Sequence, residues 1–453
     1  MDLGRVLDVV AASAAELGIE AYLVGGFVRD RLLGRDGSDR DIDIVVVGAD
    51  GVALLEAVAR RLGWARPAVF ERFATAQVRG AGFVLEVVRA RAESYDPESR
   101  KPQVRPGTLE EDIRRRDFTV NTLAQTLDGR VLDLTGRGLD DLRRGLLRTP
   151  LDPAETFSED PLRMLRAARF VAQLGFRLAA GLREAMRAMA PRTAILSAER
   201  VRDELSRLLL SAHPREGMEV LREAGLLDVL LPELVPMVGV EQGGWHHDDV
   251  WEHSLHAVEL APRDLLTRLA CLFHDAGKPA THALAPDGRH TFHDHPRPGA
   301  EIAARVMTRL RYSNDEVARV SALVLHHMRP IQYRADRMGD AAVRRLIRDL
   351  GELRERSLDL ARADTRASAF PGVDGIDELE RRMARLDAAG QVSRLRPPLD
   401  GHELVRRAGR APGPWVGRAQ RCLVEAVLDG EIPPADAEAA RRWLEEHPEL
   451  LRG

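Results

Sequence analysis

The chain has 453 residues, of which 44% are hydrophobic and 4% aromatic, and its formal net charge is −4. This length suits roughly three domains, and the weak negative charge argues against a uniformly basic nucleic-acid binder, so any basic surface must be local. No apolar run approaches the roughly 20 residues of a membrane-spanning helix, and two cysteines make no disulfide framework; we therefore expect a cytoplasmic protein without membrane contact.

The first 134 residues alternate between helix and strand patterns. Helical periodicity covers residues 6–17, 28–33 and 52–62, whereas strand-like runs cover residues 21–24, 42–47, 74–78 and 83–88. This alternation predicts a head domain of mixed α and β structure at residues 1–134.

Strand signals nearly vanish after residue 134. Apolar stripes of helical period run through residues 159–176 and 197–210, and Ser197 is the expected N-cap of the second helix. Proline- and glycine-rich breaks at 370–375 and 396–401 indicate a boundary before a small C-terminal unit. We expect a helical neck and body at 135–240, a histidine-rich domain at 241–370 and a helical tail at 371–453.

Two aspartates interrupt a run that otherwise reads as a buried strand. Asp41 and Asp43 stand in "DIDIVVV", and because side chains alternate along a strand, both carboxylates point to the same face. Two close carboxylates repel each other unless a cation lies between them, and hard oxygen ligands suit Mg²⁺. The pair predicts a two-metal site that activates an attacking hydroxyl and stabilises the leaving phosphate oxygens.

A glycine pair precedes these aspartates. Gly25 and Gly26 lie between a strand and a helix, where the absence of a Cβ lets a phosphate approach backbone N–H groups. Arg29 would add charge beside a triphosphate, and Glu86 on a later strand is a candidate third carboxylate. A lone glycine pair or a lone Asp-x-Asp would indicate only a strand, a turn and a helix, but together they predict nucleotidyl transfer.

Four motifs in order resemble class II tRNA nucleotidyltransferases and bacterial poly(A) polymerases: "LVGGFVRD…DRDIDIVV", "EEDIRRRDFTVNTLA", "EDPLRMLRAARF" and "SAERVRDELSRLLL". The resemblance implies an α+β fold with a DNA polymerase β-like head, followed by a mostly helical neck, body, further domain and tail. It implies template-independent addition of CCA to tRNA from CTP and ATP. Thr122 departs from the family, which usually has Ala there. The implied nucleotide-binding positions are Gly25, Gly26, Arg29, Arg116, Asp117, Asn121, Glu159, Asp160, Arg163, Arg166 and Arg169.

The third motif carries the implied base recognition. Asp160 and Arg163 are three residues apart, so on a helix they would be neighbours. A carboxylate accepts from the exocyclic amine of cytosine or adenine, and an arginine donates to ring nitrogens or carbonyls. By the resemblance, Glu159 holds the arginine and Asp117 reads the ribose 2′-hydroxyl. From spacing alone, the two residues would form an exposed ion pair that contributes little to stability.

Histidine-containing motifs form a second constellation: "WEHSLHA", "LFHDAGK", "FHDHP", "LHHM" and "ARADTRA". Neutral imidazoles with carboxylates suit transition metals, and the pattern resembles the HD phosphohydrolase superfamily. The resemblance implies a metal held by His253, His274, Asp275 and Asp364. His253 is preferred to His256, and His295 with His326 or His327 would position a phosphate or a second metal.

The segment at residues 89–112 contains three prolines and a glycine, which predict a long loop without regular helix or strand. In the enzymes that this chain resembles, such a loop helps the pocket change from C to A, and CC-only relatives carry a shortened one. Its full length here favours CCA addition. CC-only, A-only and poly(A) addition stay open as alternatives within this class. The alternative of another class is a metal-dependent phosphohydrolase acting on RNA ends or nucleotides. The sequence does not determine the oligomeric state.

Overall fold

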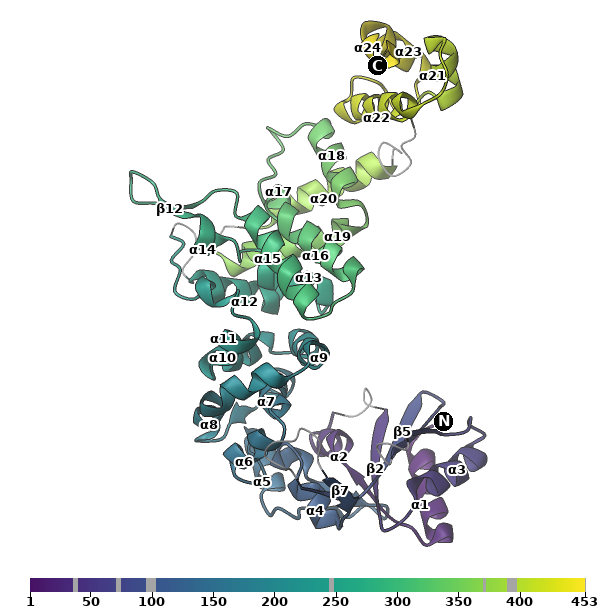
Figure 1. The fold of residues 1–453 in the computed structure, drawn as a ribbon, viewed down its shortest axis with the longest axis vertical. Helices are drawn as coiled ribbons and strands as arrows, with labels where there is room; N and C mark the ends of the chain where they lie inside the picture. The colour runs from purple at the N-terminus through teal and green to yellow at the C-terminus, as the bar shows by residue number, and fades with distance from the viewer. Residues whose placement is uncertain are drawn as a thin grey trace. The chain divides into compact units, whose positions relative to one another are not determined.

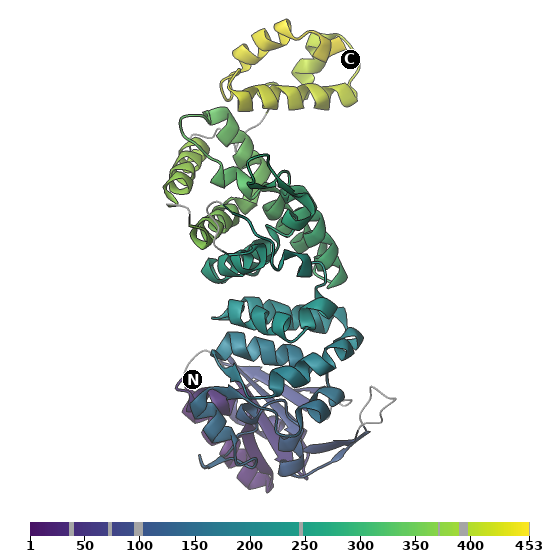
Figure 2. The ribbon, with the colours of Figure 1, turned by 90° about the vertical axis from the view of Figure 1, so that its left-hand side faces the viewer.

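The computed structural model describes residues 1–35, 40–70, 75–94, 103–243, 248–369, 372–388 and 397–452. It divides into two compact units, Met1–Leu230 and Leu231–Gly453 (Figure 1, Figure 2). The first unit combines a sheet with helices, and the second is mostly helical, which confirms the α+β class. No helix in the described part of the chain is long and apolar enough to cross a membrane.

The head of the first unit is a seven-stranded sheet in the order β3-β4-β5-β2-β1-β8-β9. Parallel pairing joins β2 to β5, and the other neighbours run antiparallel. The topology therefore places β5 directly beside the strand that carries the two aspartates. The strands are β1 (Glu20–Val24), β2 (Asp41–Val47), β3 (Ala68–Phe70), β4 (Thr75–Gly80), β5 (Phe83–Arg89), β8 (Ala124–Thr126) and β9 (Val131–Leu132).

Helices α1 (Leu3–Leu17) and α3 (Gly51–Leu62) pack against each other and against one face of this sheet (Figure 1). Ile42 and Ile44 of β2 are fully buried, whereas the alternating Asp41 and Asp43 are exposed. The predicted strand period is thus confirmed at the position that matters for the site.

The segment predicted to lack regular structure contains a two-stranded ribbon and a helix. Strands β6 (Arg91–Ser94) and β7 (Gln103–Pro106) pair antiparallel, and a capping box starts α4 (Leu109–Arg114). The prediction was wrong because Pro106 occupies the last position of an edge strand, where a missing N–H interrupts no ladder. Residues 95–102, with the other two prolines, lie outside the described residues.

A helical region follows the head. Its main contacts join α7 to α9 and α10, and Ser197 caps α9 by accepting from the backbone N–H of Arg200. The helices are α2 (Gly26–Leu32) within the head, then α5 (Gly138–Arg144), α6 (Pro153–Glu159), α7 (Leu162–Leu174), α8 (Leu182–Met189), α9 (Ala198–Leu209), α10 (Pro214–Glu223) and α11 (Leu226–Leu230), with a short parallel pair, β10 (Leu146–Leu147) and β11 (Arg177–Leu178).

One predicted helix is broken. The run from Glu159 was expected to be continuous, but α6 ends there and α7 begins at Leu162. Asp160 precedes Pro161 and has extended backbone angles, φ −140° and ψ 101°, because the ring of a following proline excludes the α region. Asp160 therefore lies in a turn between two helices.

In the second unit, α12, α13, α15, α16 and α19 pack together (Figure 1). A separate apolar core around Trp415 and Leu423 holds the last helices together. The elements are α12 (Val250–Leu260), α13 (Leu265–Phe273), α14 (Lys278–Thr281), β12 (His282–Leu284), β13 (His290–Phe292), α15 (Pro296–Arg309), α16 (Asn314–His326), α17 (Met328–Ile331), α18 (Asp340–Leu350), α19 (Arg354–Ala367), α20 (Asp374–Ala388), α21 (Gly401–Ala408), α22 (Pro414–Asp429), α23 (Ala437–Glu446) and α24 (Glu449–Arg452).

Candidate functional site

Three carboxylates share one face of the head sheet. In the parallel pairing of β2 with β5, Asp43 lies opposite Glu86 and Asp41 lies opposite Val84. Glu86 is half-buried, and its Oε2 accepts a hydrogen bond from Nε2 of Gln77 at 3.2 Å. The alignment therefore puts a third acidic side chain beside the Asp-x-Asp pair, where hard oxygen donors for a divalent metal are close together.

Gly25 brings backbone close to these acids. It has φ +71°, and a Cβ added there would lie 3.1 Å from Oδ2 of Asp43 and 3.4 Å from Nη1 of Arg116. A glycine is therefore required both by the backbone conformation and by the approach of the two side chains. Arg116 is itself paired with the buried carboxylate of Asp112, at 3.0 Å.

Arg29 is buried rather than exposed to a triphosphate. Its guanidinium donates to both oxygens of Asp30, at 2.8 and 2.7 Å, and to Oδ1 of Asn121 at 2.7 Å. The expected free cation is thus neutralised within the protein, and the side chain ties α2 to the second motif. The adjacent Asp30 was the sequence feature that could have indicated this pairing.

Asp117 is the centre of a buried polar network. Its Oδ1 accepts from Nδ2 of Asn121 at 2.9 Å and from the backbone N–H of Phe118, and its Oδ2 pairs with Arg166 at 2.6 Å. Burial alone would raise the pKa of Asp117, but Arg166 and these hydrogen bonds lower it to about 2. The carboxylate is therefore ionised and fixed in orientation.

The expected Asp160–Arg163 pair on one helix is absent from this part of the described structure, because Asp160 lies in the turn before α7. Nη1 of Arg163 donates to Oε2 of Glu159 at 2.8 Å, as the resemblance implied, and Nη2 donates to the backbone carbonyl of Arg115. Asp160 instead pairs with Arg200 of α9, at 2.9 Å.

The arginines of α7 that the resemblance assigns to nucleotide binding are largely neutralised by carboxylates. Arg169 donates from Nε to Oε2 of Glu204 at 2.6 Å, and Arg166 lies 4.0 Å from the same carboxylate. Sequence reasoning missed Glu204 and Arg200. Their four-residue spacing in the fourth motif places them on one face of a helix and could have indicated a shared partner surface.

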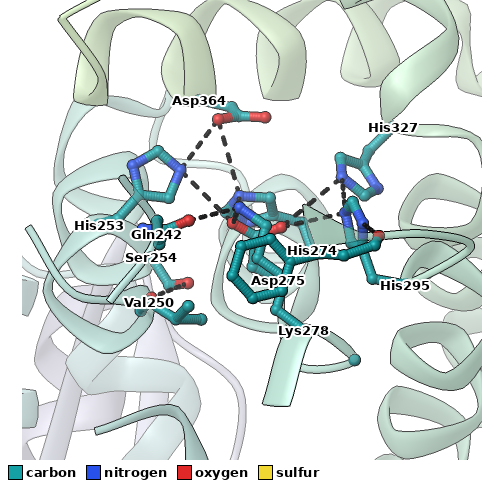
Figure 3. A network of polar contacts seen from close by, with 12 residues as sticks. Gln242, Val250, His253, Ser254, His274, Asp275, Lys278, His295, His327 and Asp364 are labelled. Atoms are coloured by element: carbon teal, nitrogen blue, oxygen red, sulfur yellow. Dashed lines mark hydrogen bonds and ion pairs between the residues drawn. The ribbon is translucent and has the colours of Figure 1, made fainter. Parts of the chain in front are cut away.

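Side chains from α12, from α19 and from the ends of α13, α15 and α16 meet in the second unit (Figure 3). Nε2 of His253 lies 3.0 Å from Oδ1 of Asp364, and Asp275 lies 3.2 Å from Nε2 of both His274 and His295. The cluster forms two groups of possible ligand atoms, each within 4.8 Å: His253, His274 and Asp364, and Asp275, His295 and His327.

Backbone carbonyls orient three of these histidines. Nδ1 of His274, His295 and His327 lies 2.7, 2.9 and 2.7 Å from the carbonyl oxygens of Cys271, Phe292 and Val324. Because a carbonyl can only accept, each Nδ1 carries a proton, and Nε2 faces the centre of the cluster. This arrangement is typical of histidine ligands of transition metals.

The buried carboxylates of this cluster require a neighbouring positive charge to neutralise them. Burial lowers the pKa of His274, but Asp275 and Asp364 raise it to about 9, so a proton or a metal must balance them. Lys278 also pairs with Oδ2 of Asp275, at 2.7 Å. Sequence reasoning missed Lys278, although it stands three residues after Asp275 and is one of few lysines in the chain. His256 and His326 do not belong to either ligand group, so His253 and His327 are the members.

Family comparisons match three segments in chain order. Residues 21–148 match "Poly A polymerase head domain", residues 175–237 match "Probable RNA and SrmB- binding site of polymerase A", and residues 250–369 match "HD domain". These segments contain the head carboxylates, the fourth motif and the histidine cluster, respectively.

Two relatives are similar over nearly the whole chain. The A-adding tRNA nucleotidyltransferase of Deinococcus radiodurans is 39% identical over 448 residues, 94% of this chain and 96% of the relative. The CC-adding tRNA nucleotidyltransferase of Thermus thermophilus is 38% identical over 439 residues, 94% of this chain and 93% of the relative. The solved Bacillus stearothermophilus CCA-adding enzyme in complex with CTP is 25% identical with a TM-score of 0.71, covering 99% of this chain and 98% of that one. The chain therefore belongs to the tRNA nucleotidyltransferase family, as the four motifs indicated.

Proposed function

We propose that the chain builds or repairs the 3′-terminal CCA of tRNA without a template, using CTP and ATP. The observation that carries this proposal is the alignment of Asp41, Asp43 and Glu86 on one face of the head sheet, beside Gly25 and Arg116. The names of the relatives support the same reaction class, because one adds A and the other adds CC to tRNA.

In this reaction the 3′-hydroxyl of tRNA attacks the α-phosphate of the nucleotide, and pyrophosphate leaves. The family implies a divalent metal, and three carboxylates on one face fit Mg²⁺, which when bound would offset phosphate charge and favour the attacking alkoxide. Asp41 and Asp43 would hold it, and Gln77 orients Glu86 through its hydrogen bond. Arg116, whose guanidinium lies beside Gly25, would contact phosphate oxygens.

Asp160 supplies the acceptor that distinguishes bases. Its carboxylate suits the exocyclic amine of cytosine or adenine, whereas uracil and guanine present a keto oxygen at the corresponding position. Glu159 fixes Arg163, which is the expected donor to the base. Asp117 is ionised and is the candidate acceptor for the ribose 2′-hydroxyl.

A single experiment distinguishes CCA addition from its variants. Purified protein is incubated with tRNA ending before CCA and with tRNA ending in CC, using labelled CTP and ATP separately and together. Complete CCA addition with both nucleotides supports the proposal. Two C residues without A, or A only on tRNA ending in CC, would assign the chain to the specificity named for one of its two relatives. No incorporation at all would refute nucleotidyl transfer.

The predicted parts have separate tasks in this proposal. The head (1–134) catalyses the reaction, the neck within 135–240 reads the base, and the body within 135–240 holds the tRNA together with the tail (371–453). The contribution of the segment at 89–112 to A addition, and a cytoplasmic location, stay predictions. Fractionation of cells that produce the tagged protein would test the location.

A second candidate function belongs to the HD domain (241–370). The observation that favours it is the double ligand group, with three imidazoles oriented by backbone carbonyls. The donor set fits a transition metal, which when bound would polarise a phosphate oxygen and activate water. Asp275 would link the two groups, and Lys278 would offset negative charge. Metal analysis and phosphate release from RNA 3′ ends and nucleotides test this metal-dependent phosphohydrolase.

A further inference from the structure

The proposed function assigns no task to the fourth motif, "SAERVRDELSRLLL". It forms α9, and two of its charged side chains, Arg200 and Glu204, lie one turn apart. Glu204 pairs with Arg169 of α7, and Arg200 pairs with Asp160 in the turn before α7. The helix therefore supplies counter-charges to the segment that carries the candidate base reader.

Both oxygens of the Asp160 carboxylate have a defined donor. Oδ1 accepts from the backbone N–H of Leu162 at 3.1 Å, and Oδ2 accepts from Nη2 of Arg200 at 2.9 Å. The terminal torsion of an aspartate is otherwise broad, so two donors on different oxygens fix the plane of this carboxylate. Leu162 restrains one oxygen through the backbone, and Arg200 is the side chain that restrains the other.

The guanidinium of Arg163 does not restrain the carboxylate of Asp160 in this structure. It donates to Glu159 and to the backbone carbonyls of Thr156 and Arg115, and the side chain is 9% exposed. The side chain of Arg200 is 49% exposed, so it borders the space beside the Asp160 carboxylate that solvent reaches.

We propose that Arg200 is a positioning residue for base choice, which fixes the Asp160 carboxylate so that its remaining lone pairs accept the exocyclic amine of cytosine or adenine. The inference rests on the proposed function. A carboxylate has about four acceptor sites, so Asp160 keeps its bond to Arg200 while it accepts an amine. A keto oxygen at the same position meets an acceptor that cannot rotate away, and uracil and guanine are rejected.

The test compares Arg200→Ala, Arg200→Lys and Arg202→Ala in the full chain. Arg202 is the matched control because it lies on the same helix and pairs with its neighbour Asp203, at 2.8 Å. Incorporation into trimmed tRNA gives kcat/KM for CTP against UTP and for ATP against GTP. The lost ion pair is half-exposed and contributes little to folding, which circular dichroism and thermal melting check.

Arg200→Ala should lower the ratio of correct to incorrect kcat/KM by roughly tenfold, the size of one lost polar contact at a base-reading site. Arg200→Lys should restore most of that ratio, and Arg202→Ala should keep the wild-type ratio. If Arg200 had a merely structural role, Arg200→Ala would lower kcat/KM equally for all four nucleotides. That result would overturn the positioning role.

Asp160→Asn distinguishes failure of this inference from failure of the proposed base reader. If Asp160→Asn leaves the ratio unchanged, Asp160 does not read the base. That result refutes both the proposed base-reading site and the positioning role of Arg200. If Asp160→Asn lowers the ratio while Arg200→Ala leaves it at the wild-type value, only the positioning role is overturned.

Discussion

Gly25→Ala should damage catalysis more than folding. The residue has φ +71° and ψ −141°, a conformation that is nearly restricted to glycine, so alanine should cost about 1–3 kcal/mol of unfolding free energy. The new Cβ would also lie 3.1 Å from Oδ2 of Asp43, and this contact is tight enough to displace the carboxylate by a few tenths of an ångström.

The effect on the reaction follows from that displacement. Misplacing a catalytic group by a fraction of an ångström to one ångström costs on the order of 10- to 100-fold in rate, so kcat for C and A addition should fall by that amount. Incorporation of labelled nucleotides into trimmed tRNA measures the rate, and urea denaturation measures the free energy of unfolding.

Gly18→Ala is the control for this prediction. Gly18 also has a positive φ, +61°, at the end of α1, but a Cβ there meets nothing within 4 Å among the described residues. It should lose about 1–2 kcal/mol of stability and keep the wild-type rate. Normal kcat in Gly25→Ala, or an equal loss in both variants, would refute the argument that close packing against Asp43 matters.

Further predictions address the other charged groups. Asp41→Asn and Asp43→Asn should each abolish nucleotide addition while tRNA affinity in filter binding stays near wild type, and substantial Mg²⁺-dependent incorporation by both would contradict the metal-binding role. The pKa of Asp117 is lowered to about 2 from an ordinary 3.8. Its ionised form therefore stabilises the fold by about 2 kcal/mol above about pH 4, and this contribution to the free energy of unfolding is lost as the pH falls through 2. Asp117→Asn should therefore flatten the acid side of the stability profile measured by urea unfolding, and an unchanged profile would contradict the network. His274→Ala combined with Asp275→Ala should remove the bound transition metal and any phosphate release but leave nucleotide addition intact; metal analysis of purified protein checks this, and wild-type protein that binds no such metal would refute the site.

Much of the candidate catalytic face was determined locally. The two-residue period of a strand places Asp41 and Asp43 together, and apolar neighbours on either side identify the buried face. The turn at Asp160 is also a local feature, because the residue before Pro161 is disfavoured in a helix, and this effect outweighs the helical periodicity of the run. These features depend on neighbours within a few residues, which a sequence displays directly.

Tertiary structure decided the pairings. Glu86 reaches Asp43 only through the parallel pairing of strands that are separated in the chain by β3 and β4, and Arg200 replaces Arg163 as the partner of Asp160 because α9 packs on α7. Such contacts join residues about 40 positions apart. The sequence contains many other residues with the same charge as the observed partner, so it does not show which of them forms the contact.

The histidine cluster shows both contributions. The sequence by itself predicted the motifs and the types of candidate ligand, but it left His326 and His327 as alternatives. Adjacent residues near the end of a helix point about 100° apart, so only one of two neighbouring histidines can face a given centre. The packing of α16 against α13 and α15 selects His327, because the direction in which a helix faces is set by the helices around it and not by its own sequence.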